Sequence, residues 1–116
     1  MPLSPAAMQF SAWLCTLLVE TAGMALLTPR PARVRAVAYT LGVNLVVHPL
    51  FWLGHARLLA GTGQVGLLGA EAVVVLVEGC CYMAGLGWSW RRGLGVSFLL
   101  NLASYSIGLA LWALLR

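Results

Sequence analysis

The chain contains no lysine and no aspartate, and charged residues make up only 9% of its 116 positions. A soluble domain carries about a quarter charged residues. Hydrophobic residues account for 61% of the chain, and its mean hydropathy is +0.91. A soluble chain this short could not bury so much apolar surface. The composition therefore excludes a soluble globular protein and predicts an integral membrane protein that contacts the lipid bilayer.

Several motifs that carry chemistry are also missing. The sequence has no glycine-rich phosphate loop and no HExxH, GxSxG or CxxC motif. Its three cysteines, Cys15, Cys80 and Cys81, all fall within apolar runs, where a free cysteine packs as a small hydrophobic side chain. No disulfide framework is predicted. The net charge of +4 comes from arginines beside the apolar runs, which indicates membrane topology, and we expect no nucleic-acid binding.

Four apolar runs are each close to the roughly 20 residues that a helix needs to cross a bilayer. Segments with proline or glycine separate them, and no repeat period or linker is visible. The start of the chain lacks the basic segment of a signal peptide, so the first run is predicted to be a retained helix. We expect one all-α domain over residues 1–116, an integral membrane four-helix bundle. Its predicted spans are about 10–27, 36–53, 67–87 and 94–115.

The arginines near the span ends predict the orientation. In a protein with four spans the first and third loops share a side of the membrane, and here they hold five of the seven arginines. Cytoplasmic loops of membrane proteins carry an excess of arginine. We therefore expect the chain in the cell inner membrane, with these two loops on the cytoplasmic side and both termini on the outer side. The five are Arg30, Arg33, Arg35, Arg91 and Arg92, and the two on the other side are Arg57 and Arg116.

All three acids lie within predicted spans, where a charged side chain costs at least about 2.5–3.5 kcal/mol on insertion scales. Glu71 and Glu78 are nearly two helical turns apart, so they project from one face of the third span. Acids inside a membrane normally face protein or a water-filled cavity. We therefore expect Glu20, Glu71 and Glu78 to turn inward, with Glu71 nearer the outer surface and within reach of His55 or Arg57.

Each remaining span also carries a polar stripe. Asn44 and His48 are four residues apart on the second span, and Asn101 and Ser104 lie three apart on the fourth. At about 1.5 Å of rise per residue, these stripes bring amides and an imidazole to a depth similar to that of the acids. We predict a buried polar layer of Glu20, Asn44, His48, Glu78 and Asn101. The candidate proton- or ligand-binding residues are these five together with Glu71 and Ser104.

The polar layer allows several interpretations. Buried acids can be protonated and join helices as hydrogen-bond donors, or they can form a path for a proton or cation. A metal site is a further interpretation, with His48, Glu78 and Cys80 as candidate ligands. Pro49 cannot donate a backbone hydrogen bond and is expected to kink the second helix beside His48. The imidazole there could also ligate a haem or a pigment, so the cofactor stays open.

Three stretches, NLVVHPLFW (44–52), EAVVVLVEGCCY (71–82) and SFLLNLASYSIG (97–108), are similar to small four-helix proteins of the bacterial inner membrane. This resemblance covers the three later spans and implies a shared polar layer, without an assigned function. The four-helix size and Glu20 in the first span also look like the small multidrug resistance exporters, where such a glutamate binds proton and drug. Those exporters have no pair of glutamates in the third helix and no His-Pro in the second.

The first functional hypothesis is a small transporter that couples the passage of a small solute to a proton or cation. Four short helices enclose little volume, so we expect a homo-oligomer or a larger membrane complex. The alternative is a non-catalytic subunit of such a complex, whose polar faces dock partner helices, a haem or a pigment. An intramembrane enzyme is a third hypothesis, because Ser104, His48 and Glu78 supply a nucleophile, a base and an acid.

Overall fold

The computed structural model describes residues 3–58 and 60–114, which form four helices. In chain order these are α1 (Pro5–Leu27), α2 (Arg30–Leu58), α3 (Gly63–Leu86) and α4 (Trp90–Leu114). Each helix is long enough and apolar enough to cross a membrane. The predicted all-α class is confirmed, and the four helices indicate a multi-pass membrane protein. The end of the fourth predicted span at residue 115, and Arg116, lie outside the described residues.

All four helices begin before the predicted spans, and capping signals mark the start of α1 and the end of α3. α1 begins at Pro5 and not near residue 10, since Ser4 Oγ accepts a hydrogen bond from the Ala7 amide at 3.2 Å and proline suits the first turn. α3 is followed by Gly87, whose φ of 67° is the left-handed conformation common after a helix C-terminus. α2 begins at residue 30 and not at 36, and it continues through Pro49.

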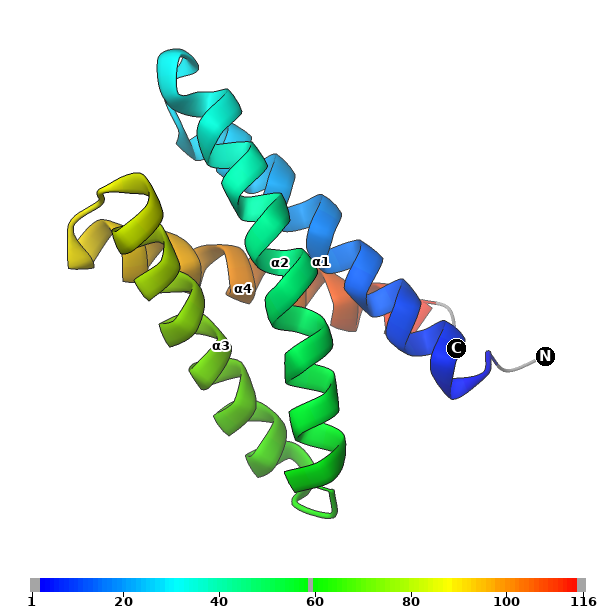
Figure 1. Cartoon of the computed structure of the whole chain (residues 1–116). Coiled ribbons are helices and arrows are strands. Elements are labelled where there is room, and N and C mark those ends of the chain that lie inside the picture. The colour runs from blue at the N-terminus through cyan, green and yellow to red at the C-terminus, as the bar shows by residue number, and fades with distance from the viewer. Residues whose placement is uncertain (1–2, 59, 115–116) are drawn as a thin grey trace.

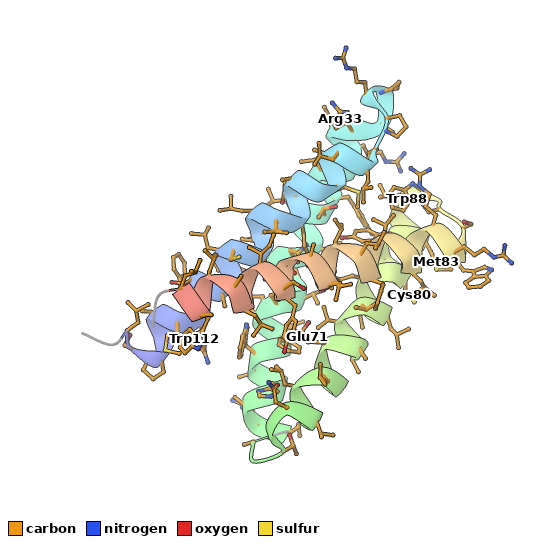
Figure 2. The ribbon with its side chains drawn as sticks, turned by 180° about the vertical axis from the view of Figure 1, so that it is seen from behind. Arg33, Glu71, Cys80, Met83, Trp88 and Trp112 are labelled. Atoms are coloured by element: carbon orange, nitrogen blue, oxygen red, sulfur yellow. The ribbon has the colours of Figure 1, made fainter. Side chains whose placement is uncertain are left out.

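The arginine-rich segments that were expected in loops belong to helices. Three arginines lie in the first two turns of α2 and two lie in the first turn of α4. Arg35 Nη2 donates a hydrogen bond of 2.9 Å to the Gly85 carbonyl near the end of α3, so both arginine groups lie at one end of the bundle. We call this the arginine end, and the opposite end, where α1 begins and α4 finishes, the termini end. Figure 2 shows Arg33 at the former and Trp112 toward the latter.

The four helices form a ring in which each packs against its neighbours in the chain and α4 closes against α1 (Figure 1). Over the described ranges, the backbone of α1 does not approach that of α3, and α2 does not approach α4, so side chains fill the centre. Buried positions recur every four residues, a spacing whose ridges pack helices at oblique angles. These positions are Ala36, Thr40, Asn44 and His48 on α2, and Gly66, Ala70, Val74, Glu78 and Tyr82 on α3.

The chain folds as two hairpins of the same form, α1–α2 and α3–α4, although the sequence has no visible repeat. Glu20 of α1 is bonded to Asn44 of α2, and the corresponding pair on α3 and α4 is Glu78 and Asn101. The two pairs have sequence separations of 24 and 23 residues. Equivalent helices lie diagonally opposite in the ring. The two hairpins thus match in the placement of one acid–amide pair each.

The close approach of α3 and α4 depends on glycine. A Cβ atom added at Gly93 would lie 2.9 Å from the backbone oxygen of Gly79 and 2.7 Å from Cγ of Met83. The backbone oxygen cannot rotate away, so the two helices would have to separate. We expect Gly93→Ala to destabilise the fold by about 1–3 kcal/mol, measured as a lower midpoint of unfolding in a denaturing-detergent titration. Gly95→Ala is the matched control, because a Cβ there meets nothing within 4 Å. Equal midpoints for the two variants would contradict this packing.

Candidate functional site

A layer of polar side chains occupies the centre of the bundle. Glu20 and Glu78, from the diagonally opposite helices α1 and α3, are both fully buried, with 0% of each residue exposed. Asn44 Nδ2 donates a hydrogen bond of 2.9 Å to Glu20 Oε2. Asn101 Nδ2 donates one of 2.8 Å to Glu78 Oε2. All four helices therefore contribute to the layer, and its acids face protein as expected.

Both asparagines are held in place by their own helices. The Nδ2 atom of Asn44 also donates to the Thr40 carbonyl at 3.0 Å, and that of Asn101 donates to the Ser97 carbonyl at 2.8 Å. These bonds fix the orientation of each amide, because only the NH₂ group can donate. Oε2 of each carboxylate therefore has a fixed donor, and Oε1 is left to face other partners.

His48 and Ser104 complete the layer on the side of the termini end. His48 Nε2 lies 3.6 Å from Glu78 Oε1, and neither atom has a hydrogen-bond partner within the part of the chain that the structure describes. Ser104 Oγ donates a bond of 3.3 Å to Glu20 Oε1. One potential ligand atom from each of Glu20, His48 and Glu78 lies within 4.8 Å of the other two. These three side chains share one small space.

The two buried carboxylates have no arginine partner among the described residues, and their one ion-pair contact is that of Glu78 with His48. The described arginines lie at helix ends. Burying an ionised carboxylate without a counter-charge costs several kcal/mol. The centre therefore requires either protons or a bound cation to balance its charge.

A cavity of about 290 Å³ connects the polar layer with the termini end, and we call it the vestibule. All four helices line it. Its lining includes His48 and Ser104 of the polar layer, Leu3 and Trp112 near the termini end, and Glu71 in between. Most of the other lining side chains are apolar. A small solute or hydrated ion in the vestibule would thus meet His48, Ser104 and Glu71 directly. Glu20 and Glu78 lie behind His48 and Ser104, which contact them.

Toward the arginine end the polar layer is covered by packed apolar side chains, which we call the closing layer. It consists of Met24, Ala36, Tyr82 and Leu100, which are all buried and form one cluster. The Tyr82 ring lies 5.9 Å from the Trp88 ring, so aromatic packing continues to the helix ends. The polar layer is therefore open to a cavity on one side and covered on the other.

Two of the candidate residues lie apart from the polar layer. Glu71 lines the vestibule, and among the described residues it forms no ion pair with His55 or Arg57. Cys80 is exposed, because two residues along a helix turn it about 200° from Glu78. It is not among the clustered metal-ligand atoms. Glu20 belongs to that cluster, although the sequence-based metal candidates did not include it.

The nucleophile and base considered for an enzyme are not paired. Ser104 Oγ is bonded to Glu20 Oε1 and to the Asn101 carbonyl, at 3.3 and 3.1 Å. Over residues 3–58 and 60–114 no hydrogen bond joins it to His48. The geometry thus brings the acids and the imidazole together, and it does not pair the Ser104 hydroxyl with His48 in the described part of the chain.

The bond between Asn101 and Glu78 should be measurable as a coupling energy. Asn101→Ala leaves the buried Glu78 Oε2 without a donor, and Glu78→Ala removes the acceptor. In a double-mutant cycle of these two changes we expect coupling of about 0.6 kcal/mol, the average for interhelical bonds in membranes, and at most about 1.7 kcal/mol. The free energies of unfolding come from the same detergent titration. Additive effects would show that the two side chains are not in contact.

Comparisons of the chain with protein-family models, curated proteins and solved structures find no match.

Proposed function

We propose that this chain is a small membrane transporter whose polar layer takes up a proton or cation from the vestibule, coupled to the passage of a small solute. The observation that carries the proposal is a cavity of about 290 Å³ that reaches His48 beside two fully buried carboxylates. Intramembrane acids of this kind mark proton relays and ion pathways. A purely structural pair of hydrogen bonds would not need a cavity leading to it.

The orientation of the path follows from the arginine distribution. If the arginine end faces the cytoplasm, as the charge bias predicts, the vestibule opens to the outer side of the inner membrane. A cation or proton then enters from outside and exchanges at Glu78 and His48. The cation or proton can leave on the cytoplasmic side only if the side chains of the closing layer move apart.

The two hairpins are the units that would move. Each holds one acid–amide pair, and the closing layer draws residues from both hairpins: Met24 and Ala36 from the first, Tyr82 and Leu100 from the second. Rocking of one repeat against the other around a fixed site is a common means of alternating access. A homo-oligomer or a larger membrane complex, which the small size of the chain predicts, would supply the remaining walls of the path.

The proposal is tested with the full chain reconstituted into liposomes that contain a pH-sensitive dye. A panel of monovalent and divalent cations is added outside, and the internal pH is followed. We expect a cation-dependent change in internal pH that exceeds the leak of protein-free vesicles. A chain that is inert in this assay and co-purifies with larger partners in mild detergent would contradict transport and support the subunit role.

A further inference from the structure

We infer that Glu20, His48 and Glu78 form a binding site for one divalent ion of a first-row transition metal. One oxygen of each carboxylate and Nε2 of the imidazole would be the ligands. The inference rests on the proposed function, because it names the class of cation that the polar layer takes up.

The spacing of the ligand atoms suits such an ion. Bonds from zinc to nitrogen and carboxylate oxygen are about 2.0–2.2 Å, so two ligands at a tetrahedral angle lie about 3.4 Å apart. His48 Nε2 and Glu78 Oε1 are 3.6 Å apart. The three ligand atoms lie within 4.8 Å of one another, so small side-chain rotations bring Glu20 into the same sphere.

The surrounding bonds prepare these atoms for a ligand. Asn44 and Asn101 each donate a hydrogen bond to Oε2 of one carboxylate. Carboxylates that bind a metal are commonly oriented by such hydrogen bonds. Glu78 Oε1 and His48 Nε2 are buried and have no hydrogen-bond partner among the described residues. Buried polar atoms are normally paired, and a shared metal ion would satisfy both at once.

Charge selects a divalent ion over a monovalent one. Two ionised carboxylates carry two negative charges, and no described arginine lies within ion-pair distance of either. A divalent ion neutralises both, whereas a monovalent ion leaves one buried charge without a partner. Water from the vestibule can supply the remaining ligands, as in metal sites that keep open positions.

The chemistry of the donors narrows the class of metal. Magnesium and calcium prefer sites made of oxygen, and the imidazole of His48 counts against them. Copper(I) prefers sulfur, and Cys80 is exposed and outside the cluster. Two carboxylates and one imidazole suit manganese, iron, cobalt or zinc in the divalent state.

The test uses the full chain in lipid nanodiscs, stripped with a chelator and titrated with Co²⁺, whose visible absorption reports its ligands. We expect one Co²⁺ per chain, with Mg²⁺ unable to compete at equal concentration. His48→Gln should weaken binding more than about 100-fold, beyond the loss typical for residues that only orient ligands. His55→Gln, which changes the other histidine, should bind as wild type.

A second measurement does not depend on the folding of any variant. Pulsed electron paramagnetic resonance of Mn²⁺ bound to the wild type should show coupling to an imidazole nitrogen. Absence of saturable Co²⁺ binding, binding unchanged by His48→Gln, or bound Mn²⁺ without nitrogen coupling would each overturn the inference.

The liposome assay separates this inference from the proposed function. Proton flux that persists in chelator, together with absent Co²⁺ binding, would overturn the metal site and leave transport standing. Stoichiometric Co²⁺ binding lost in His48→Gln, without any flux, would support the metal site and contradict transport.

Discussion

Glu78→Gln is expected to reduce ion-coupled flux through the reconstituted protein to the level of protein-free vesicles, while the fold is kept. Glutamine has nearly the shape of glutamate, and its side-chain oxygen can still accept the bond that Asn101 donates to Glu78 at 2.8 Å. It cannot take up a proton or carry a negative charge. The variant therefore removes the exchange of protons or cations beside His48 and leaves the packing of α3 on α4. Internal pH in liposomes is the measurement.

The matched control for this variant is Cys80→Ser. Residue 80 lies on the same helix, two positions further on, and its side chain is exposed away from the polar layer. We expect wild-type flux from this control, and circular dichroism and monodispersity should be unchanged in both variants. Wild-type flux in a well-folded Glu78→Gln variant would show that Glu78 lies outside the path.

Gly108→Phe is expected to block the vestibule and lower the flux about tenfold or more, since an added barrier of only about 1.4 kcal/mol has that effect. Gly108 lines the vestibule, and a Cβ atom there meets nothing within 4 Å. A phenyl ring can therefore project into the cavity without displacing the backbone. The polar layer stays intact, so Co²⁺ should bind with wild-type affinity at equilibrium but more slowly. Stopped-flow absorption and the liposome assay give the two rates.

Gly95→Phe is the control for added bulk on α4. Gly95 is exposed, and a Cβ atom at this position also meets nothing within 4 Å. Unlike Gly108, Gly95 does not line the vestibule. We expect this variant to keep wild-type flux and wild-type binding rates. If both phenylalanine variants behave alike, the cavity is not the route to the polar layer.

Much of the polar layer could be predicted from helix periodicity. A charged or amide side chain is costly in lipid, so each span had to turn its polar stripe toward protein. Helical rise alone then put Glu20, Asn44 and Asn101 at similar depth. The bonds of Glu20 to Asn44 and of Glu78 to Asn101 agree with this argument.

Other features depend on how the helices are arranged, which the sequence does not encode locally. The ring order puts α1 diagonally across from α3, and this arrangement brings Glu20 to Glu78 and His48. The vestibule also depends on oblique packing. That Glu71 lines this cavity could not be inferred from the sequence. The depth of a residue along its own helix does not show where the neighbouring helices leave a cavity. The similar placement of the two acid–amide pairs could not be inferred either, because it depends on which helices face each other.

The measurement that tests the polar layer most directly is a solid-state NMR distance between glutamate and histidine side chains in lipid. The chain has three acids and two histidines, so a Glu71→Gln, His55→Gln protein leaves labels only at Glu20, Glu78 and His48. Strong carbon–nitrogen dephasing between the carboxyl and imidazole groups is predicted, in line with the 3.6 Å between Glu78 Oε1 and His48 Nε2. No dephasing in a folded, lipid-embedded sample would contradict a shared polar layer.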